Sequence, residues 1–407
     1  MLPDLEEISE KSENMLYLNE CGLVCALGTS HDAIKARLLK HAQTGLVMSD
    51  AYSHGRLLPL GQVAAELPNM DGWPIEQRSR NNQLALLALA QIRPAVDAAI
   101  ARFGRNRVGV VIGTSTSGVA GTETAMRQYV IDQTFPDDFH YAQQELGSPA
   151  SMLSTELGIS GPAYVHSSAC SSSGKAMASA ARLINMGLCD AVVTGGVDSL
   201  CAFTIAGFTA LETVSEQVCN PLSANRNGIN IGEGSALFLM SREPAAVGLA
   251  GWGGSSDGYH MSAPDPTGGG AMLAINQALQ RAGVRADQID YINMHGTATR
   301  QNDAMESKVI HQLFGSNVAV SSTKAFSGHT LGAAAAIEAA FCWLAMQDDN
   351  VDGILPPHLW DGEQDETLPI LNAIKPGSRL GRPIDFALSN SFAFGGSNAC
   401  LIFARTR

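Results

Sequence analysis

The stretch AYVHSSACSSSGKAMASAARLINMG, residues 163–187, passes from a β-branched apolar run through serines into an alanine-rich segment. This segment carries apolar side chains at the spacing of one helix face, namely Ala176, Met177, Ala180, Leu183 and Ile184. We therefore predict a strand over 163–167 and a helix over 172–187. A buried strand followed directly by such a helix is typical of an α/β protein.

A second stretch repeats this order. VAVSSTKAFSGHTLGAAAAIEAAFCWLAM, residues 318–346, runs from a strand through two serines and small residues into an alanine-rich helix. A diverged duplication explains the repeat, with the segment near 245–255 as the link between two halves. The two stretches share few identical residues, so the duplication stays a hypothesis at this point.

The same alternation extends along the chain, where short apolar runs bounded by glycine alternate with segments of helical spacing. We predict strands at 107–113, 163–167, 190–195, 235–240, 290–294, 318–322, 385–390 and 399–404. We predict helices at 78–102, 119–133, 172–187, 270–283, 303–314 and 331–347. The whole pattern favours an α/β fold with buried strands.

Composition narrows the function classes. The 407 residues are 45% hydrophobic and 16% charged, which is ordinary for a globular protein with one large doubled domain or two smaller ones. The net charge of −13 argues against a nucleic-acid partner, because attraction to phosphates needs a basic surface. No run of about 18 apolar residues predicts a membrane span. The acidic residues 1–15 are interpreted as a disordered lead-in without the order of a secretory signal.

The cysteine pattern indicates a reduced, cytoplasmic protein. The eight cysteines are scattered, mostly among apolar neighbours, and form no CxxC pair or metal-like cluster. They are Cys21, Cys25, Cys170, Cys189, Cys201, Cys219, Cys342 and Cys400. Cys21 and Cys25 are close in sequence, but without a second pair we interpret them as core residues.

Cys170 has two interpretations from its own window. It falls at the start of the predicted helix, where Ser171–Ser173 supply capping hydroxyls. Unpaired N–H groups and the helix dipole there favour a thiolate, lower the pKa of the thiol and stabilise an oxyanion. Free cysteine is also commonly a core residue. The window alone therefore leaves chemistry and packing open.

Two histidines stand in settings that favour chemistry. His295 follows a buried-type strand in DYINMHGTAT, and His329 lies between a glycine and a helix start, five residues after Lys324. Open α/β sheets gather their active groups at the carboxyl ends of strands. A lone histidine in such a position is more often structural, whereas two make a shared site the stronger hypothesis.

Four motifs together carry a family resemblance. SSACSSSGKAM, MHGTAT, SSTKAFSGHTLGAA and NSFAFGGSNA, in this order and at these separations, resemble the β-ketoacyl-acyl-carrier-protein synthases, the elongating condensing enzymes of fatty-acid and polyketide synthesis. The resemblance spans about residues 16–407. It implies the thiolase fold, with two pseudo-symmetric βαβαβαββ halves in a layered α-β-α-β-α arrangement, the first over 16–248 and the second over 249–407.

The resemblance also implies roles for individual residues. Cys170 resembles the acyl-accepting nucleophile, and His295 and His329 resemble the histidines of a Cys-His-His triad. Lys324 resembles the lysine that supports the second histidine. Phe394 resembles the gating phenylalanine whose N–H, with that of Cys170, forms the oxyanion hole.

Further positions match binding and structural residues of the family. Thr297 and Thr299 resemble the threonines that hold the pantetheine arm, and Gly395 and Gly396 belong to the mobile gate. Glu306 and Glu338 match acidic positions of the family and are expected to be structural, pairing with nearby charges. Arg226 and Glu233, in the turn before a core strand, are also expected to be structural.

The implied reaction is a decarboxylative Claisen condensation of malonyl carrier with a Cys-bound acyl chain. It requires no metal or redox cofactor, because the phosphopantetheine arrives on the acyl carrier protein. The partners expected are that carrier and a second ketosynthase-like subunit, in a homodimer or a heterodimer. Arg78, Arg80 and Arg127 are the cations that family position suggests for carrier docking.

Four positions depart from the common family pattern without touching the triad: Arg300 for a proline, Ala393 for a glycine, Ser397 for a threonine and Asn227 for an aspartate. Three rivals remain beside the main hypothesis. A thiolase needs a second catalytic cysteine, for which Cys400 is the candidate. A non-catalytic chain-length partner typically lacks the nucleophile, and an initiating synthase has asparagine where this chain has His329.

Overall fold

The computed structural model describes residues 15–53 and 55–406, so all but the last residue of the expected lead-in lies outside the described residues. The strands are β1 (Leu16–Cys25), β2 (Val47–Ser49), β3 (Leu58–Leu60), β4 (Val108–Gly113), β5 (Ala163–His166), β6 (Ala191–Asp198), β7 (Gly234–Ser241), β8 (Val247–Ser256), β9 (Tyr291–Asn293), β10 (Ala319–Ser321), β11 (Asn372–Ala373), β12 (Phe386–Ala393) and β13 (Ser397–Arg405).

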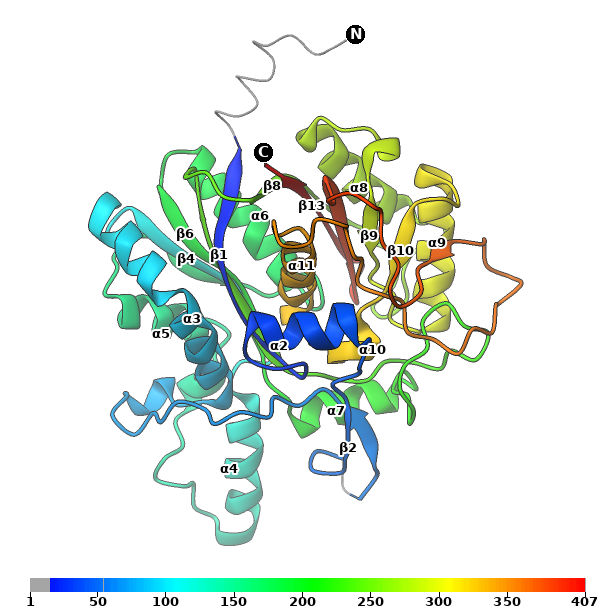
Figure 1. Cartoon of the computed structure of the whole chain (residues 1–407). Helices are drawn as coiled ribbons and strands as arrows, with labels where there is room; N and C mark the ends of the chain where they lie inside the picture. Colours follow the sequence, from blue (N-terminus) through cyan, green and yellow to red (C-terminus); the bar gives the residue numbers. More distant parts are fainter. Residues whose placement is uncertain (1–14, 54, 407) are drawn as a thin grey trace.

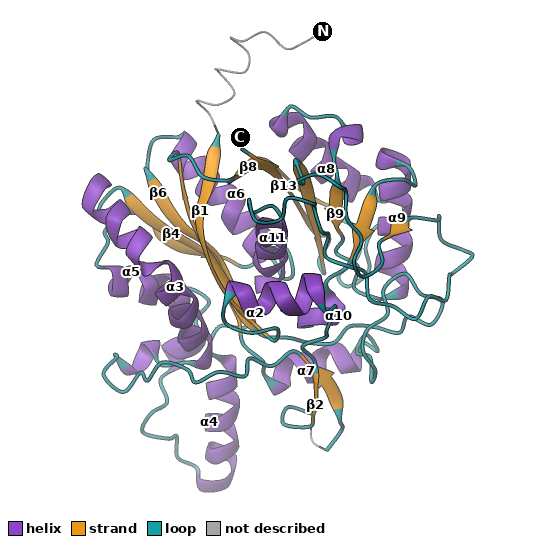
Figure 2. Cartoon of the chain, in the orientation of Figure 1, coloured by secondary structure: helices purple, strands orange, loops and turns teal. Residues whose placement is uncertain are grey.

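The helices are α2 (His31–Lys35), α3 (Arg80–Phe103), α4 (Val119–Asp132), α5 (Ser148–Leu157), α6 (Ser172–Asn185), α7 (Ala202–Ala210), α8 (Gly269–Ala282), α9 (Arg300–Phe314), α10 (Lys324–Ser327) and α11 (Ala334–Ala345). A 3₁₀ turn, Leu331–Ala333, leads into α11 where a continuous helix was expected. Figure 2 shows where the helices and strands lie in the molecule.

Two halves of the molecule share one strand topology. The first half is ordered β5-β4-β6-β7-β1 and the second β10-β9-β12-β13-β8, so both read third, second, fourth, fifth, first in chain order. In each half the inner pairs β4/β6 and β9/β12 are parallel, whereas the fifth strand is antiparallel to both of its neighbours. This common pattern supports the duplication hypothesis and places the chain in the thiolase fold.

The two halves are joined through their first strands. β1 pairs with β8 at Leu16–Leu249 and Tyr17–Gly248, which makes one 11-stranded sheet with β11 added at its edge. The segment near 245–255 is therefore a strand and not a link, which corrects the prediction. The strand was not predicted because glycine is unusual inside a strand. Here glycine is required by close packing, since a Cβ at Gly253 would lie 1.7 Å from the carbonyl oxygen of Ala274 in α8.

The halves form layers around a central pair of helices (Figure 1). α3 and α5 pack on the outer face of the first half, α8 packs on the outer face of the second half with α9 beside it, and α6 and α11 lie between the halves. All residues of α11 are buried, as expected of an alanine-rich helix that is apolar on every side.

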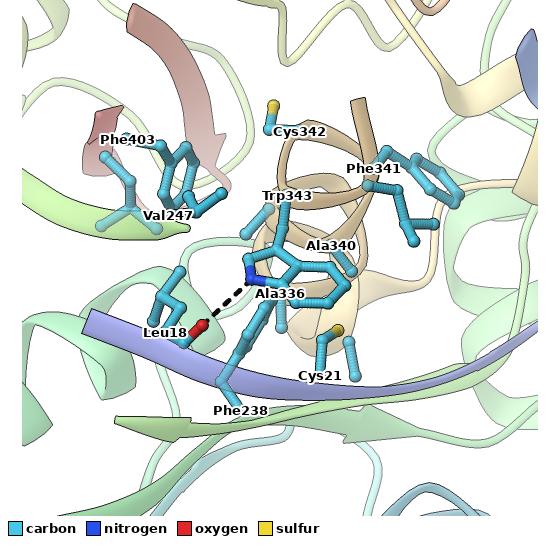
Figure 3. Close-up of a cluster of buried hydrophobic side chains, with 14 of the residues drawn as sticks. Leu18, Cys21, Phe238, Val247, Ala336, Ala340, Phe341, Cys342, Trp343 and Phe403 are labelled. Carbon is cyan, nitrogen blue, oxygen red and sulfur yellow. Dashed lines mark hydrogen bonds between the residues drawn. The ribbon is translucent and has the colours of Figure 1, made fainter. Parts of the chain in front are cut away.

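The core around α11 joins both halves, as Figure 3 shows. Trp343 of α11 packs with Phe238 of β7 and Phe403 of β13, and its Nε1–H donates to the carbonyl of Leu18 in β1 at 3.1 Å. The strand ends that carry the candidate site residues are thereby held by one shared core.

By length and composition, α3 is the one helix among the described residues that is long and apolar enough to cross a membrane. It lies across the first half of the sheet, where Leu84, Leu89 and Ile92 are buried in the core. These contacts are those of a core helix in a globular protein.

Candidate active site

Cys170 lies on the tight connection between β5 and α6. The preceding residue, Ala169, has a φ of +49°, a left-handed conformation that costs energy for a residue with a Cβ. Ser172 holds this turn, because its hydroxyl accepts from the N–H of Ser168 at 2.9 Å and donates to the carbonyl of Ala169 at 2.5 Å. The backbone is thus strained and pinned immediately before the sulfur.

The serines after Cys170 do not cap α6, which corrects the sequence prediction. Ser171 occupies the N-cap but makes no side-chain cap hydrogen bond. Its hydroxyl instead bonds Ser397 at 2.9 Å, and the hydroxyl of Ser173 accepts from the N–H of Ala336 at 3.0 Å. The serines therefore tie the start of α6 to β13 and α11.

The structure brings both predicted histidines to Cys170. His329 Nε2 lies 3.0 Å from Cys170 Sγ, and the rings of His295 and His329 are 5.4 Å apart, edge to face. All three side chains are buried, with exposed fractions of 5%, 2% and 2% for Cys170, His295 and His329. One small group, such as a thioester carbonyl, would contact all three at once.

Each histidine is placed by backbone hydrogen bonds. His295 follows β9, and the N–H groups of His295 and Gly296 both donate to the Glu306 carboxylate at 2.8 Å. The N–H of His329 donates to the carbonyl of Asn230 at 2.7 Å. Glu306 is thus a structural acid, as expected. Its partners within the described residues are N–H and amide groups, not the nearby cation that was predicted.

Lys324 and Glu338 form an ion pair, and the Lys324 charge acts on both histidine rings. Their side chains are 2% and 4% exposed, so the pair is buried, and the pairing predicted for Glu338 is present. Burial raises the pKa of Glu338, and the Lys324 ammonium counteracts that rise.

The charge state of the site differs from the sequence prediction. Burial raises the pKa of the Cys170 thiol to about 11, although the Lys324 charge and the backbone N–H groups of Phe394 and Cys170 lower it. Desolvation therefore outweighs the effect of the helix start that was expected to favour a thiolate. Burial and, secondarily, Lys324 hold the pKa of both His295 and His329 well below the usual value, so both rings are neutral.

The predicted gate connects β12 to β13. Gly395 and Gly396 have φ values of +81° and +72°, which favour glycine. The N–H of Gly395 donates to the carbonyl of Met261 at 2.8 Å, so a hydrogen bond joins the gate to the loop after β8. The N–H of Phe394 points at Cys170 Sγ, while its ring lies 5.6 Å from that of Phe208.

A pocket of about 200 Å³ opens above the sulfur and contains the predicted arm-binding residues. Thr297 and Thr299 line it, and their hydroxyl oxygens are 2.9 Å apart. Phe208 and Leu211, at the end of α7, line another part of the wall. The pocket is therefore polar at the threonines and apolar beside α7.

Sequence reasoning missed Asp198, at the end of β6. Its buried carboxylate accepts hydrogen bonds from the residues Thr114, Ser115 and Thr116 after β4, and from the N–H of Gly332, three residues beyond His329, at 2.6 Å. Asp198 thereby ties the first half to the turn that carries His329. An acid directly after the apolar run DAVVTGGVDS was the available signal.

The cations predicted for docking are mostly occupied. Arg80 pairs with buried Glu233 at 2.5 Å, and Arg78 donates to the carbonyls of Trp73 and Asp71. Arg127 is exposed on α4. The structural roles expected for Glu233 and Arg226 agree with their contacts, since Arg226 pairs with Asp365 at 2.5 Å.

Three of the four departures from the family pattern lie close to the site. Ala393 is buried at the end of β12, Ser397 bonds Ser171 and Lys175, and Arg300 is exposed at the start of α9. Asn227 is exposed in the turn before β7.

The ligand atoms of Cys170, His295 and His329 lie within 4.8 Å of one another, a spacing that would also suit a metal ion. The raised pKa keeps the sulfur a thiol at neutral pH, and the charge of Lys324 acts on all three groups. Both features oppose a cation. The group fits a neutral carbonyl oxygen better.

Comparison with known proteins identifies the family of this chain. Residues 62–246 match the beta-ketoacyl synthase N-terminal domain and residues 247–359 its C-terminal domain. The chain is 35% identical to 3-oxoacyl-[acyl-carrier-protein] synthase 2 of Rhizobium meliloti (strain 1021), covering 86% of this chain and 87% of that protein. It is 30% identical to Nodulation protein E of the same strain, covering 96% and 99%.

Solved structures give the same result. The ketosynthase ApeO, in complex with its chain length factor ApeC from Xenorhabdus doucetiae, matches with a TM-score of 0.91 and 45% identity over 96% of this chain and 98% of that one. A beta-ketoacyl synthase from Burkholderia phymatum STM815 matches with a TM-score of 0.84 and 28% identity over 97% and 100%. The chain therefore belongs to the beta-ketoacyl synthase family, and it is a condensing acyltransferase of fatty-acid or polyketide synthesis.

Proposed function

We propose that this chain is the catalytic ketosynthase subunit of a heterodimer, and that it takes both of its substrates from an acyl carrier protein. The contact between His329 Nε2 and Cys170 Sγ carries the catalytic part of the proposal, because it joins a nucleophile to a neutral base in the pocket.

Acylation begins at Cys170. The sulfur attacks the carbonyl of an acyl-carrier thioester, a new C–S bond forms, and the carrier thiol leaves. Because the pKa of Cys170 is raised, its proton must move as the sulfur attacks, and His329 Nε2 is placed to pass it to the leaving thiolate. The N–H groups of Phe394 and Cys170 then stabilise the oxyanion.

Condensation follows when a malonyl carrier enters. N–H donors of neutral His295 and His329 hold its thioester oxygen, the bond to the carboxylate breaks, CO₂ leaves and an enolate forms. The enolate carbon attacks the acyl carbonyl on Cys170, the C–S bond breaks, and a proton from solvent restores the thiol. The β-ketoacyl product leaves on the carrier. No step of this cycle requires a metal or a redox cofactor.

His329 needs a different tautomer in each half of this cycle. Nε2 must be unprotonated to receive the thiol proton and protonated to hold the malonyl oxygen. Within the described part of the chain, its Nδ1 has no hydrogen-bond partner. No hydrogen bond at Nδ1 therefore fixes the ring in either tautomer.

Surface features support a paired subunit. β5 is an edge strand that pairs with β4 alone among the described strands, and α4 and the turn after it expose large apolar side chains: Met126, Val130, Ile131 and Phe135. Phe203 on α7 is 70% exposed beside them. An unpaired edge and an apolar surface of this kind favour a protein interface. The similar ketosynthase ApeO pairs with a chain length factor, which favours a heterodimer over a homodimer.

The thiolase alternative receives no support from the site. Cys400, its candidate second cysteine, is fully buried in β13 and lies outside the residues that line the catalytic pocket. The cytoplasmic location stays a prediction from the cysteine pattern.

The test is a condensation assay with the chain alone and with a co-expressed chain length factor. We expect Cys170 acylation in both samples, and full condensation with a 1:1 complex by sedimentation only in the second. A stable homodimer that condenses at the same rate would overturn the heterodimer but not the reaction.

A further inference from the structure

A second groove adjoins the catalytic pocket on the side of α9. It has a volume of about 320 Å³, and its lining includes Tyr259, Pro266, Arg300 and Lys308. Pro264 and Gln301 line both this groove and the catalytic pocket, so the two spaces are continuous. A substrate that leaves the pocket past Thr299 therefore meets Arg300 at the next residue.

Two cations of this groove are available for a ligand. Arg300 and Lys308 are both exposed, and neither has a hydrogen bond or ion pair within residues 15–53 and 55–406. They are eight residues apart, or about 12 Å along the helix axis. The neighbouring acid Asp265 directs its carboxylate to the N–H and hydroxyl of Thr267, and it does not line the groove.

The start of α9 adds to this positive field. Arg300 is its first residue, and the N-cap Thr299 makes no side-chain cap hydrogen bond. The first N–H groups of this 15-residue helix are thus left without a capping side chain, and their dipole favours an anion, which the buried Asp303 carboxylate in the first turn partly satisfies. The chain has a net charge of −13, but this groove carries two exposed cations, Arg300 at the start of α9 and Lys308 about two turns further along it.

We propose that the groove binds the phosphodiester of the carrier-borne phosphopantetheine arm, held by Arg300 and Lys308 while Thr297 and Thr299 hold the pantetheine. The proposal rests on the proposed function. A planar guanidinium suits two phosphate oxygens at once, and the Lys308 ammonium adds a point charge. The thioester then lies in the pocket and the phosphate at its mouth, which sets the reach of the arm.

The experiment compares two small donors that differ only in the phosphate, acyl-pantetheine and acyl-phosphopantetheine, together with the acyl carrier protein. Transfer of the acyl group to Cys170 in the intact complex is followed by mass spectrometry. One unit charge at 4 Å in water contributes about 1 kcal/mol, or about fivefold. We therefore expect Arg300→Gln and Lys308→Gln each to reduce the kcat/KM advantage of the phosphorylated donor about fivefold, mainly through KM.

Two control variants sharpen the result. Arg300→Lys keeps the charge and should retain more of the advantage than Arg300→Gln. Lys40→Gln removes another exposed cation, which lines neither space, and the advantage should persist.

An unchanged advantage in Arg300→Gln and Lys308→Gln would overturn the proposal. So would an effect confined to the full carrier, since this would assign the cations to acidic side chains of the carrier. If the wild-type complex transfers acyl groups from no donor, both the groove and the proposed function fail, whereas normal transfer with an unchanged advantage rejects the groove alone.

Discussion

The buried Lys324–Glu338 pair offers the sharpest test of the site electrostatics. With 2% and 4% exposure, neither side chain can be rehydrated when the other is removed. Breaking such a pair by deleting one partner costs about 3–5 kcal/mol, because an uncompensated charge is left in the core. We expect Lys324→Met to lower the free energy of unfolding by that amount.

The double variant separates charge from packing. In Lys324→Met/Glu338→Gln both charges are absent, so the cost relative to wild type should fall to about 1 kcal/mol. The Lys324→Met penalty should also shrink as the pH falls, because the pKa of Glu338 is already raised by burial and a protonated Glu338 is neutral.

Urea unfolding monitored by circular dichroism measures these differences. Arg93→Gln is the control, since Arg93 pairs with Asp97 and Glu156 at partly exposed positions and each such pair contributes at most about 1 kcal/mol. A Lys324→Met penalty no larger than that of the control, or a double variant that costs as much as Lys324→Met and Glu338→Gln added together, would refute the reasoning. Lys324→Met should also acylate Cys170 more slowly than wild type, because loss of the Lys324 ammonium raises the pKa of the Cys170 thiol further.

Three other perturbations test separate parts of the account. Alkylation of Cys170 by iodoacetamide should still accelerate above pH 9, since its pKa is about 11; a plateau near pH 7 would contradict this. Asp198→Asn should shift the pH profile of Cys170 alkylation to lower pH, because the Asp198 charge raises the pKa of Cys170. It should also lower the free energy of unfolding by about 1–3 kcal/mol, because buried donors lose their acceptor. An unshifted profile would argue against the position assigned to Asp198. Gly113→Ala places a Cβ 2.2 Å from the Ser173 nitrogen and should lower the free energy of unfolding by about 1–3 kcal/mol, measured by thermal unfolding. Gly207→Ala is the control, since its Cβ meets no atom within 4 Å. Equal effects of the two variants would contradict the close approach of β4 to α6.

Much of the fold was predictable because most elements carry a clear period. The predicted strands over 235–240 and 399–404 and the helix over 119–133 agree with the structure to within two residues at each end. Elements that the sequence did not indicate have physical reasons. β1 contains Asn19 and Glu20 at a register shift, which hides its alternation.

The site was predictable where motifs carried chemistry. Cys170, His295 and His329 come together as expected: they follow β5, β9 and α10, and all three line one pocket. Asp198 was missed because its role depends on contacts with Gly332, 134 residues away. The direction of the Cys170 pKa was wrong because burial depends on packing from both halves, which no local window contains.

The most direct test of the central claim is the location of the acyl group. The protein is incubated with an acyl-carrier thioester, digested, and its eight cysteines are examined by mass spectrometry, with Cys170→Ala in parallel. We expect the acyl group on Cys170 alone, and neither acylation nor condensation in the variant. An acyl group on another cysteine, or condensation by Cys170→Ala, would contradict the account.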